Sequence, residues 1–399
     1  MPGERHPLAM PDGSRALSLS LHSRIADIPA AEWDACAGGD NPFVSHAFLA
    51  ALEDSGSVTA RTGWLPQHAA LRDTEGRLVA CAPCYAKSHS RGEYVFDYAW
   101  ADALERSGGR YYPKLQVCVP FSPVPGPRLL VRPGTGVPVA ALAQGLAQAC
   151  EELGTSSVHV TFCTAGEWTA LGEAGWLRRL GVQFHWHNAG YESFDDFLGA
   201  LSSRKRKAIR RERRDAAASG LTLRTLRGHE ITPRYWAAFH RFYRSTTDKK
   251  WGRSAYLTPQ FWPLLGERLG DAVVLMVAEQ DGDPVAGALN LLGREALYGR
   301  NWGSLIDMPF LHFELCYYRA IEFAIENRLP RVEAGAQGEH KIQRGYLPVP
   351  TYSAHWIAHP GLRRGVADFL VHERRAMEQE IAELATLSPF RRGGEEEET

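Results

Sequence analysis

A dense basic segment is the feature of this sequence with the most evident chemistry. Eight of the eleven residues from Arg204 to Arg214 are lysine or arginine, although the formal net charge of the 399-residue chain is only −1. Exposed cations this close repel one another by about 1 kcal/mol per pair unless an anion lies among them. The segment therefore indicates a site for a phosphate-bearing partner: tRNA, coenzyme A or a nucleotide-linked precursor.

The spacing of the basic segment predicts a helix with two different sides. One broad arc carries Arg206, Lys207, Arg210, Arg211, Arg213 and Arg214. The opposite side carries Phe197, Leu201, Ala208, Ile209 and Ala216, with a break expected at residues 202–203. We expect Arg206, Arg210 and Arg211 to bind phosphate groups. In a second interpretation, which stays open, the cations pair with Asp195, Asp196, Glu212 and Asp215.

Two histidines lie close together in the string "FHWHN". His185 and His187 occupy one side of an expected strand, a spacing that two metal ligands can have, but the sequence identifies no third ligand. We therefore expect no metal site, and we expect these histidines to line a buried polar region where His187 contacts the substrate.

A second polar and aromatic cluster follows an expected helix in the string "TTDKKWGR". Lys249, Lys250 and Trp251 fit a loop that holds the substrate. They fit equally well a helix C-terminus, where cations are favourable because the helix dipole is negative at that end. Both interpretations stay open.

The composition is that of a soluble globular protein, with 44% hydrophobic and 23% charged residues. No run of eighteen apolar residues predicts a membrane span, and the first residues lack the apolar core of a secretory signal. Seven scattered cysteines indicate reduced thiols and a cytoplasmic location. Cys81 and Cys84 have redox or zinc spacing, but they lie in an alternating strand pattern and are expected to be structural. The absence of a recognition-helix or zinc motif argues against DNA binding.

The elements expected along the chain occur in the same order twice. The first half has a strand at 17–28, a helix at 41–56, β runs at 63–88, a helix at 137–154 and a strand at 156–162. The second half has a strand at 220–226, helices at 232–251 and 258–270, three strands at 271–304, a helix at 309–329 and a strand at 330–335. We predict an α/β fold with domains at 17–180 and 181–375, a disordered tail at 1–16, and a helix end with an acidic tail at 376–399.

This order resembles that of the FemAB-like family of predicted N-acyltransferases, which belongs to the GNAT superfamily and is described by peptidoglycan biosynthesis or recognition. Strings that carry the resemblance include "FDYAWADALERSGG", "LSSRKRKAIRRERR", "LHFELCYYRAIEFAI" and "EAGAQGEHKIQRGYLP". The resemblance covers roughly residues 20–380. It implies a bacterial protein with two tandem GNAT-like units of the Fem type, with mixed sheets.

The string "GEHKIQRGYLP" resembles a Fem-type signature in which a lysine precedes a glycine by four residues, here Lys341 and Gly345. His340 stands where the family has an aromatic residue. The resemblance implies that Lys341 stabilises the charged carbonyl oxygen of the donor, and a fixed cation there lowers the barrier by several kcal/mol. We expect Lys341 to be exposed in a cleft; the alternative is a surface turn without a catalytic role.

Acyl transfer to an amine also needs an acceptor for the proton of the nucleophile. Candidates are Glu333, Glu339 and His340 near the lysine, together with Asp97 from the first half. Trp100 lies beside Asp97 in the family-like string and is expected to contact the substrate. Fem-type transfer can also use groups of the substrate itself.

The turn before the expected helix at 137–154 bears on the identity of the donor. Acetyl-CoA enzymes hold pyrophosphate at such a turn with backbone N–H groups and a glutamine or arginine. The string "VRPGTGV" keeps Gly134 and Gly136, but Val131 stands at the Gln or Arg position and Arg132 lies one residue away. The corresponding turn in the second half, "GSLIDMPFLHF", lacks these features. We therefore favour an aminoacyl-tRNA-like donor over acyl-CoA.

The sequence thus predicts an N-acyltransferase that moves an acyl or aminoacyl group to an amine acceptor, such as a peptidoglycan precursor, a small peptide or an amino acid. Its co-substrate would be aminoacyl-tRNA or acyl-CoA, and no tightly bound cofactor is expected. The alternative is a non-catalytic module that binds a cell-wall precursor or peptide between the two domains.

Overall fold

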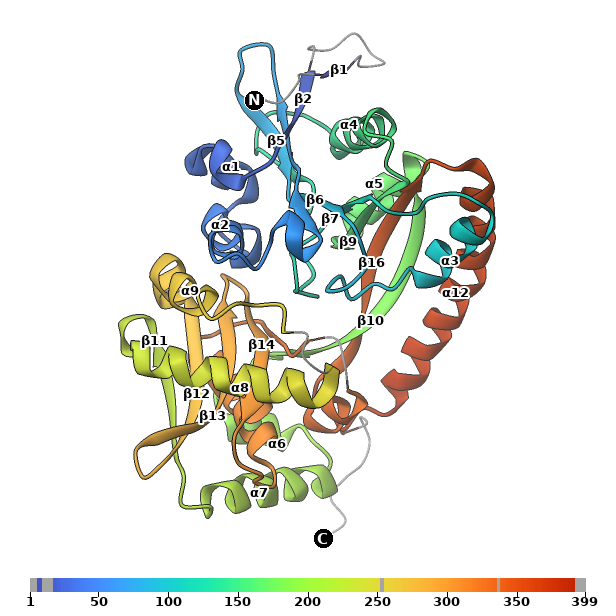
Figure 1. The fold of residues 1–399 in the computed structure, drawn as a ribbon. Helices are drawn as coiled ribbons and strands as arrows, with labels where there is room; N and C mark the ends of the chain where they lie inside the picture. The colour runs from blue at the N-terminus through green and yellow to red at the C-terminus, as the bar shows by residue number, and fades with distance from the viewer. Residues whose placement is uncertain (1–5, 9–16, 252–254, 336–337, 392–399) are drawn as a thin grey trace. The chain divides into compact units, whose positions relative to one another are not determined.

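The chain forms two compact units, each assembled from separate segments. The computed structural model describes residues 6–8, 17–251, 255–335 and 338–391, without the side chains of 6–8 and 249–251 (Figure 1). Within these limits, unit 1 comprises the segments up to Gly181, Tyr256–Phe261 and Pro350–Glu378. Unit 2 comprises Val182–Ala255, Trp262–Val349 and the segment from Gln379. Within the described residues, no helix is long and apolar enough to cross a membrane.

Unit 1 begins with helices and hairpins and continues into an alternation of strands and helices. Its strands are β1 His6–Leu8, β2 Leu17–His22, β3 Trp64–Pro66, β4 His68–Arg72, β5 Leu78–Ala82, β6 Cys84–Lys87, β7 Lys114–Val117, β8 Leu130–Val131 and β9 Ser157–Cys163. Its α-helices are α1 Ala30–Ala37, α2 His46–Asp54, α3 Tyr98–Arg106, α4 Val139–Glu152 and α5 Ala165–Glu173. Short 3-10 helices lie at Ile25–Asp27, Pro42–Val44 and Ala60–Thr62.

The strands of unit 1 form an antiparallel group and a mixed group. The first has the order β1-β2-β4-β5-β8, and all its neighbours are antiparallel. In the second, β7 and β9 are parallel because α4 carries the chain from one side to the other, as in a βαβ unit. Strand β9 is also paired with β16, Leu347–Ile357, through Tyr352–Ile357. A core of Leu, Val, Ala and Cys side chains lies between these strands and α4.

Unit 2 is built on an antiparallel meander that ends in a parallel strand. The strands are β11 Thr222–Arg227, β12 Val273–Gln280, β13 Asp283–Leu292, β14 Ala296–Ser304 and β15 Arg331–Glu333. Strand β15 lies parallel to β14 and antiparallel to β10, Leu177–His187. The sheet is therefore mixed, as the sequence predicts.

The helices of unit 2 flank this meander. They are α6 Phe194–Gly199, α7 Ser203–Ala217, α8 Pro233–Trp251, α9 Phe261–Leu269, α10 Leu311–Phe313 and α11 Arg319–Glu326, with 3-10 helices at Gly228–Glu230 and Gly270–Ala272 (Figure 1). A π-helical turn, Glu314–Tyr318, joins α10 to α11. Such turns are rare and occur often at functional sites. Buried side chains from one face of β12, from other strands and from the helices form a hydrophobic core.

The chain passes from one unit to the other within four elements and once between elements. The elements are β10, α9, β16 and α12, Pro360–Thr386, and the remaining passage lies between Ala255 and Tyr256. Neither unit is therefore a continuous stretch of sequence.

Candidate functional site

The turn that carries Lys341 follows strand β15 and ends in a 3-10 helix, Glu339–Arg344. Lys341 is only 3% exposed, and its Nζ donates a hydrogen bond of 2.9 Å to the carbonyl oxygen of Gly335. The expectation of an exposed lysine is wrong, because the short helix turns this side chain inward. Gly345 ends the helix with a φ of 90°, and a Cβ atom there would lie 2.9 Å from the ring of Phe197. Only glycine allows the chain to reverse so close to that ring.

Polar side chains surround Lys341 at the end of the central strands. Glu333 in β15 lies opposite His185 in β10 and Tyr298 in β14. Arg331 Nε donates to Glu333 Oε1 at 2.9 Å. Burial, assisted by neighbouring cations that include Lys341, lowers the pKa of His185 to about 3. This histidine is therefore neutral at physiological pH.

The candidate proton acceptors near Lys341 differ in how accessible they are. Glu333 is 3% exposed and paired with Arg331, so it is a poor base for an incoming amine. Glu339 and His340 are exposed on the 3-10 helix, and His340 Nε2 lies 2.9 Å from the hydroxyl of Tyr317. The arrangement makes His340 and Glu339 more accessible proton acceptors than Glu333.

Helix α7 carries the basic segment and begins after the predicted break. The chain ends α6 at Gly199, and Ser202 precedes α7 without a side-chain cap. Ile209 and Ala216 are buried, as the predicted apolar side requires, whereas Ala208 is exposed. Phe197 and Leu201 are also buried, but they belong to the segment before α7.

The C-terminal half of α7 has acidic partners. Arg210 lies 3.1 Å from Asp195, and Asp215 lies 3.5 Å from Arg211 and 3.8 Å from Arg214. These exposed pairs contribute little stability. Of the acids named by the second interpretation, Asp195 and Asp215 thus do pair with the basic segment.

Arg213 has stronger partners than its neighbours on the helix. It donates hydrogen bonds to both carboxylate oxygens of Glu314 at 3.1 Å, and to Glu322 at 3.1 and 3.3 Å. Glu314 is buried in the π-helical turn. Charge-assisted pairs of this kind fix geometry, so Arg213 attaches α7 to the π-helical turn and to α11.

Two further acids named by the sequence have other roles. Asp196 accepts hydrogen bonds from the backbone of Ser193 and caps α6. Glu212 pairs with Arg344 at 2.9 Å and accepts a hydrogen bond from Tyr318. Because Arg344 belongs to the same 3-10 helix as Lys341, this ion pair connects α7 to the lysine turn.

The N-terminal half of α7 lacks such compensation. Arg204, Lys205, Arg206 and Lys207 are exposed or half-buried, and none has an acid within 4.0 Å among the residues that the structure describes. Backbone N–H groups make the start of a helix electropositive, so cations are unfavourable there. Positive charge is therefore concentrated at this end of the helix, where it favours an anionic ligand.

Other predicted substrate-binding residues lie in different places of unit 2. His187 lies at the end of β10 with much of its surface exposed, and partial desolvation together with the Arg331 charge lowers the pKa of its ring. Lys249, Lys250 and Trp251 are the last residues of α8, and their side chains lie outside the described part of the structure. Their role as substrate-binding residues stays a prediction.

Asp97 and Trp100 belong to a buried polar network in unit 1. Lys114 Nζ donates to Glu93 at 2.7 Å and also to Asp97, which accepts a hydrogen bond of 2.7 Å from Tyr111. Burial by itself would raise the pKa of Asp97, but the Lys114 ammonium and hydrogen bonds hold it well below its usual value. Asp97 is thus a weak base. Trp100 is 5% exposed and packs beside this network.

Two histidines extend this network through the mixed sheet of unit 1. His159 Nδ1 lies 2.7 Å from His355 Nδ1, and its Nε2 lies 2.7 Å from the Ser157 hydroxyl. Burial lowers the pKa of His159 to about 3. Both rings are therefore neutral members of a hydrogen-bonded core.

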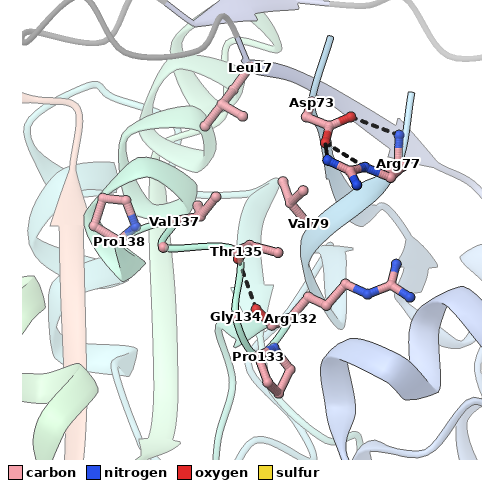
Figure 2. Close-up of a pocket in the computed structure, with 11 residues that line it drawn as sticks. Leu17, Asp73, Arg77, Val79, Arg132, Pro133, Gly134, Thr135, Val137 and Pro138 are labelled. Carbon is pink, nitrogen blue, oxygen red and sulfur yellow. Dashed lines mark hydrogen bonds and ion pairs between the residues drawn. The ribbon is translucent and has the colours of Figure 1, made fainter. Parts of the chain in front are cut away.

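The glycine-rich turn between β8 and α4 lines a hollow of about 670 Å³. Figure 2 shows Arg132, Gly134 and Thr135 on this turn, with Asp73 and Arg77 on the facing hairpin. Arg77 pairs with Asp73 at 2.8 Å, while Arg132 reaches only a backbone carbonyl at 3.4 Å. The hollow lies where the sequence predicts a degenerate phosphate-binding turn.

The cysteines behave as structural residues. Cys81 and Cys84 lie in β5 and β6 and are buried, and the described cysteines are unbridged. Among the described residues, no group of three metal-ligating side chains is present.

Sequence reasoning missed several residues of the site in unit 2. Arg331, Tyr317 and Arg344 contact the predicted residues but were not singled out. Arg331 and Glu333 alternate on one strand, which was a usable signal for a pair on one face. Tyr317 and Arg344 meet their partners only through the tertiary fold.

Solved structures share the fold at low sequence identity. The C-terminal domain of a putative lysylphosphatidylglycerol synthetase from Agrobacterium fabrum has a TM-score of 0.53 and 10% identity, over 86% of this chain and 95% of that one. FemX has a TM-score of 0.53 and 11% identity, over 85% of this chain and 98% of that one. A tandem GNAT protein from the clavulanic acid pathway has a TM-score of 0.47 and 12% identity, over 86% and 99%.

The predicted mixed α/β fold class is confirmed, and the chain shares the fold of FemX. A family model described as peptidoglycan biosynthesis/recognition matches residues 24–392. The chain therefore belongs to the FemAB-like family, and its function is related to peptidoglycan. No curated protein was found to match the sequence.

Proposed function

We propose that this protein is an N-acyltransferase that moves an acyl or aminoacyl group from a phosphate-bearing donor to an amine acceptor. The acceptor is a peptidoglycan precursor, a small peptide or an amino acid. Lys341 and helix α7 provide the two parts of the donor site in this proposal.

A single observation carries the proposal. The cations at the start of α7 lack acidic partners among the described residues, and the Glu212–Arg344 pair at 2.9 Å connects this helix to the turn of Lys341. A site for phosphate and a site for a carbonyl oxygen thus belong to one connected region of unit 2. A phosphate-bearing acyl donor needs both.

The chemistry follows from the groups at the turn. An ammonium has three N–H donors, and the hydrogen bond from Lys341 to Gly335 uses one of them. In the proposal this ammonium stabilises the oxyanion that forms when the acceptor nitrogen attacks the donor carbonyl carbon. The new C–N bond replaces the donor C–O or C–S bond. The amine proton passes to His340, Glu339 or a group of the substrate, and the leaving oxygen or sulfur takes up a proton.

For the donor, we propose aminoacyl-tRNA, with acyl-CoA as the alternative. Support comes from the basic helix, which suits an extended phosphate backbone. The turn before α4 lacks a Gln or Arg at position 131, although Arg132 lines the adjacent hollow. That hollow keeps acyl-CoA among the donors to be tested.

A second candidate function is recognition without catalysis. It is favoured by the burial of Lys341 and by the pairing of Glu333 with Arg331, which leave few free groups for chemistry. In that case a cell-wall precursor or peptide binds without being modified.

A donor screen tests the proposal. The pure protein is incubated with charged tRNA or acyl-CoA pools and a mixture of amines, and released tRNA or free thiol is measured. We expect turnover with one donor class. No turnover with any donor and any amine, while circular dichroism shows folded protein, would favour the recognition module.

A further inference from the structure

The sequence beyond the described residues contains a short acidic segment, Glu395–Glu398, that follows Arg391 closely. We propose that this segment binds the four cations at the start of α7, which have no acidic partner among the described residues, and competes there with the phosphate-bearing ligand. The identity of the competing ligand rests on the proposed function, whereas the contact itself does not.

The described end of the chain lies beside the start of α7. Ser202 N donates to the carbonyl oxygen of Pro389 at 2.9 Å, and Arg391 N donates to that of Ala200 at 3.0 Å. Leu201 and Phe390 form an antiparallel bridge between these segments. The backbone therefore leaves the described structure next to the residues that precede the basic helix.

The acidic segment can reach the cations. Glu395 is four residues beyond Arg391, a distance that an extended chain spans in about 13 Å, and Glu398 lies within about 24 Å. The cations begin four residues after Ala200, and from there the helix rises about 1.5 Å per residue. They therefore lie within roughly 18 Å of the backbone contact at Ala200.

The charges are complementary in number and in kind. Four glutamates follow Arg392, and four cations, Arg204 to Lys207, lack acidic partners among the described residues. The electropositive start of the helix adds to the attraction for carboxylates. A segment tethered this closely has an effective concentration in the millimolar range, so it competes with weakly bound anions and yields to a strongly bound polyanion.

The contact has a consequence for specificity. An anion with one or two phosphates has to displace several carboxylates and gains few contacts in return. A nucleic acid backbone offers many phosphates and displaces the segment readily. The acidic segment thus favours long phosphate-bearing ligands over small ones at α7.

The first test measures binding of a labelled RNA oligonucleotide of about 20 nucleotides by fluorescence anisotropy in low salt. The full chain is compared with a variant in which Glu395, Glu396, Glu397 and Glu398 are replaced by Gln. We expect about three- to tenfold tighter binding by the variant, with the difference shrinking as salt rises. Equal affinity at low salt would overturn the proposal.

A matched variant controls for net charge. Replacing Glu105, Glu151, Glu152 and Glu173 by Gln removes the same charge from exposed positions in unit 1. We expect this control to bind RNA with an affinity close to that of the unmodified chain. An equal gain of affinity in the control would show a general charge effect and would also overturn the proposal.

A second test detects the contact directly, without any ligand. A carbodiimide joins carboxylates to amines that touch, so mass spectrometry should find links from Glu395–Glu398 to Lys205 or Lys207. Links that stay absent, while carboxylates of the same segment couple to an added small amine, would contradict the contact. A failed donor screen would remove the proposed function but would leave both of these readouts unchanged.

Discussion

Replacing Lys341 by methionine tests the catalytic part of the proposal. Methionine fills a similar volume but has no N–H group, so the donor carbonyl loses one oxyanion stabiliser. Loss of one such donor typically costs 10²–10³-fold in kcat, or about 3–4 kcal/mol. The substitution also removes the hydrogen bond to Gly335, which contributes about 1 kcal/mol to stability. For a domain of this size, we expect the Tm to fall by about 2–4 °C.

The assay separates these two effects. Single-turnover rates are measured with the donor found in the screen, well below the Tm, and the folded fraction is followed by circular dichroism. Lys341→Arg retains the charge and serves as the control; we expect it to keep part of the activity. Unchanged kcat in the methionine variant, or a loss no larger than the loss of folded protein, would refute the oxyanion role.

Three further outcomes follow from the charges of both units. Replacing Arg206, Arg210 and Arg211 by Gln should weaken donor binding and make the slope of log affinity against log salt concentration shallower by about two to three. If this variant unfolds instead, these cations have a structural role. Arg213→Gln should lower the free energy of unfolding in urea by about 2–3 kcal/mol without changing donor affinity, because it leaves the buried Glu314 carboxylate with only the longer contact to Arg319 at 3.6 Å. Below pH 6.5 His159 becomes protonated in the unfolded chain but not in the native protein, where its pKa is about 3. At pH 4.5 this difference should lower the free energy of unfolding by about 3 kcal/mol relative to pH 7. His159→Gln should reduce that loss when unfolding is measured at both pH values.

Local patterns made much of the fold predictable. The helix expected at 137–154 is α4, and the strand expected at 156–162 is β9, because apolar spacing follows the period of each element. The break before the basic helix was also predicted, at residues 202–203. By contrast, the pattern assigned no element to Tyr98–Arg106 or Leu347–Ile357, which became α3 and β16.

The candidate site was less predictable because its contacts are distant in sequence. Arg213 and Glu314 are separated by 101 residues, and no local pattern connects them. The inward direction of Lys341 follows from the 3-10 helix Glu339–Arg344 and the hydrogen bond to Gly335, and no sequence pattern predicted either. Residue types thus indicated the chemistry, whereas burial and pairing required the tertiary structure.

The interleaved segments of the two units also bear on how the protein is synthesised. Strand β9 of unit 1 receives its neighbour β16 only when Tyr352–Ile357 have been made. Translation adds about 5–20 residues per second, so the ribosome needs roughly 10–40 s after β9 to supply this partner. During that interval one edge of β9 has no strand beside it, and such edges promote aggregation. Nascent chains arrested before residue 350 should therefore depend on chaperones more than full-length chains do.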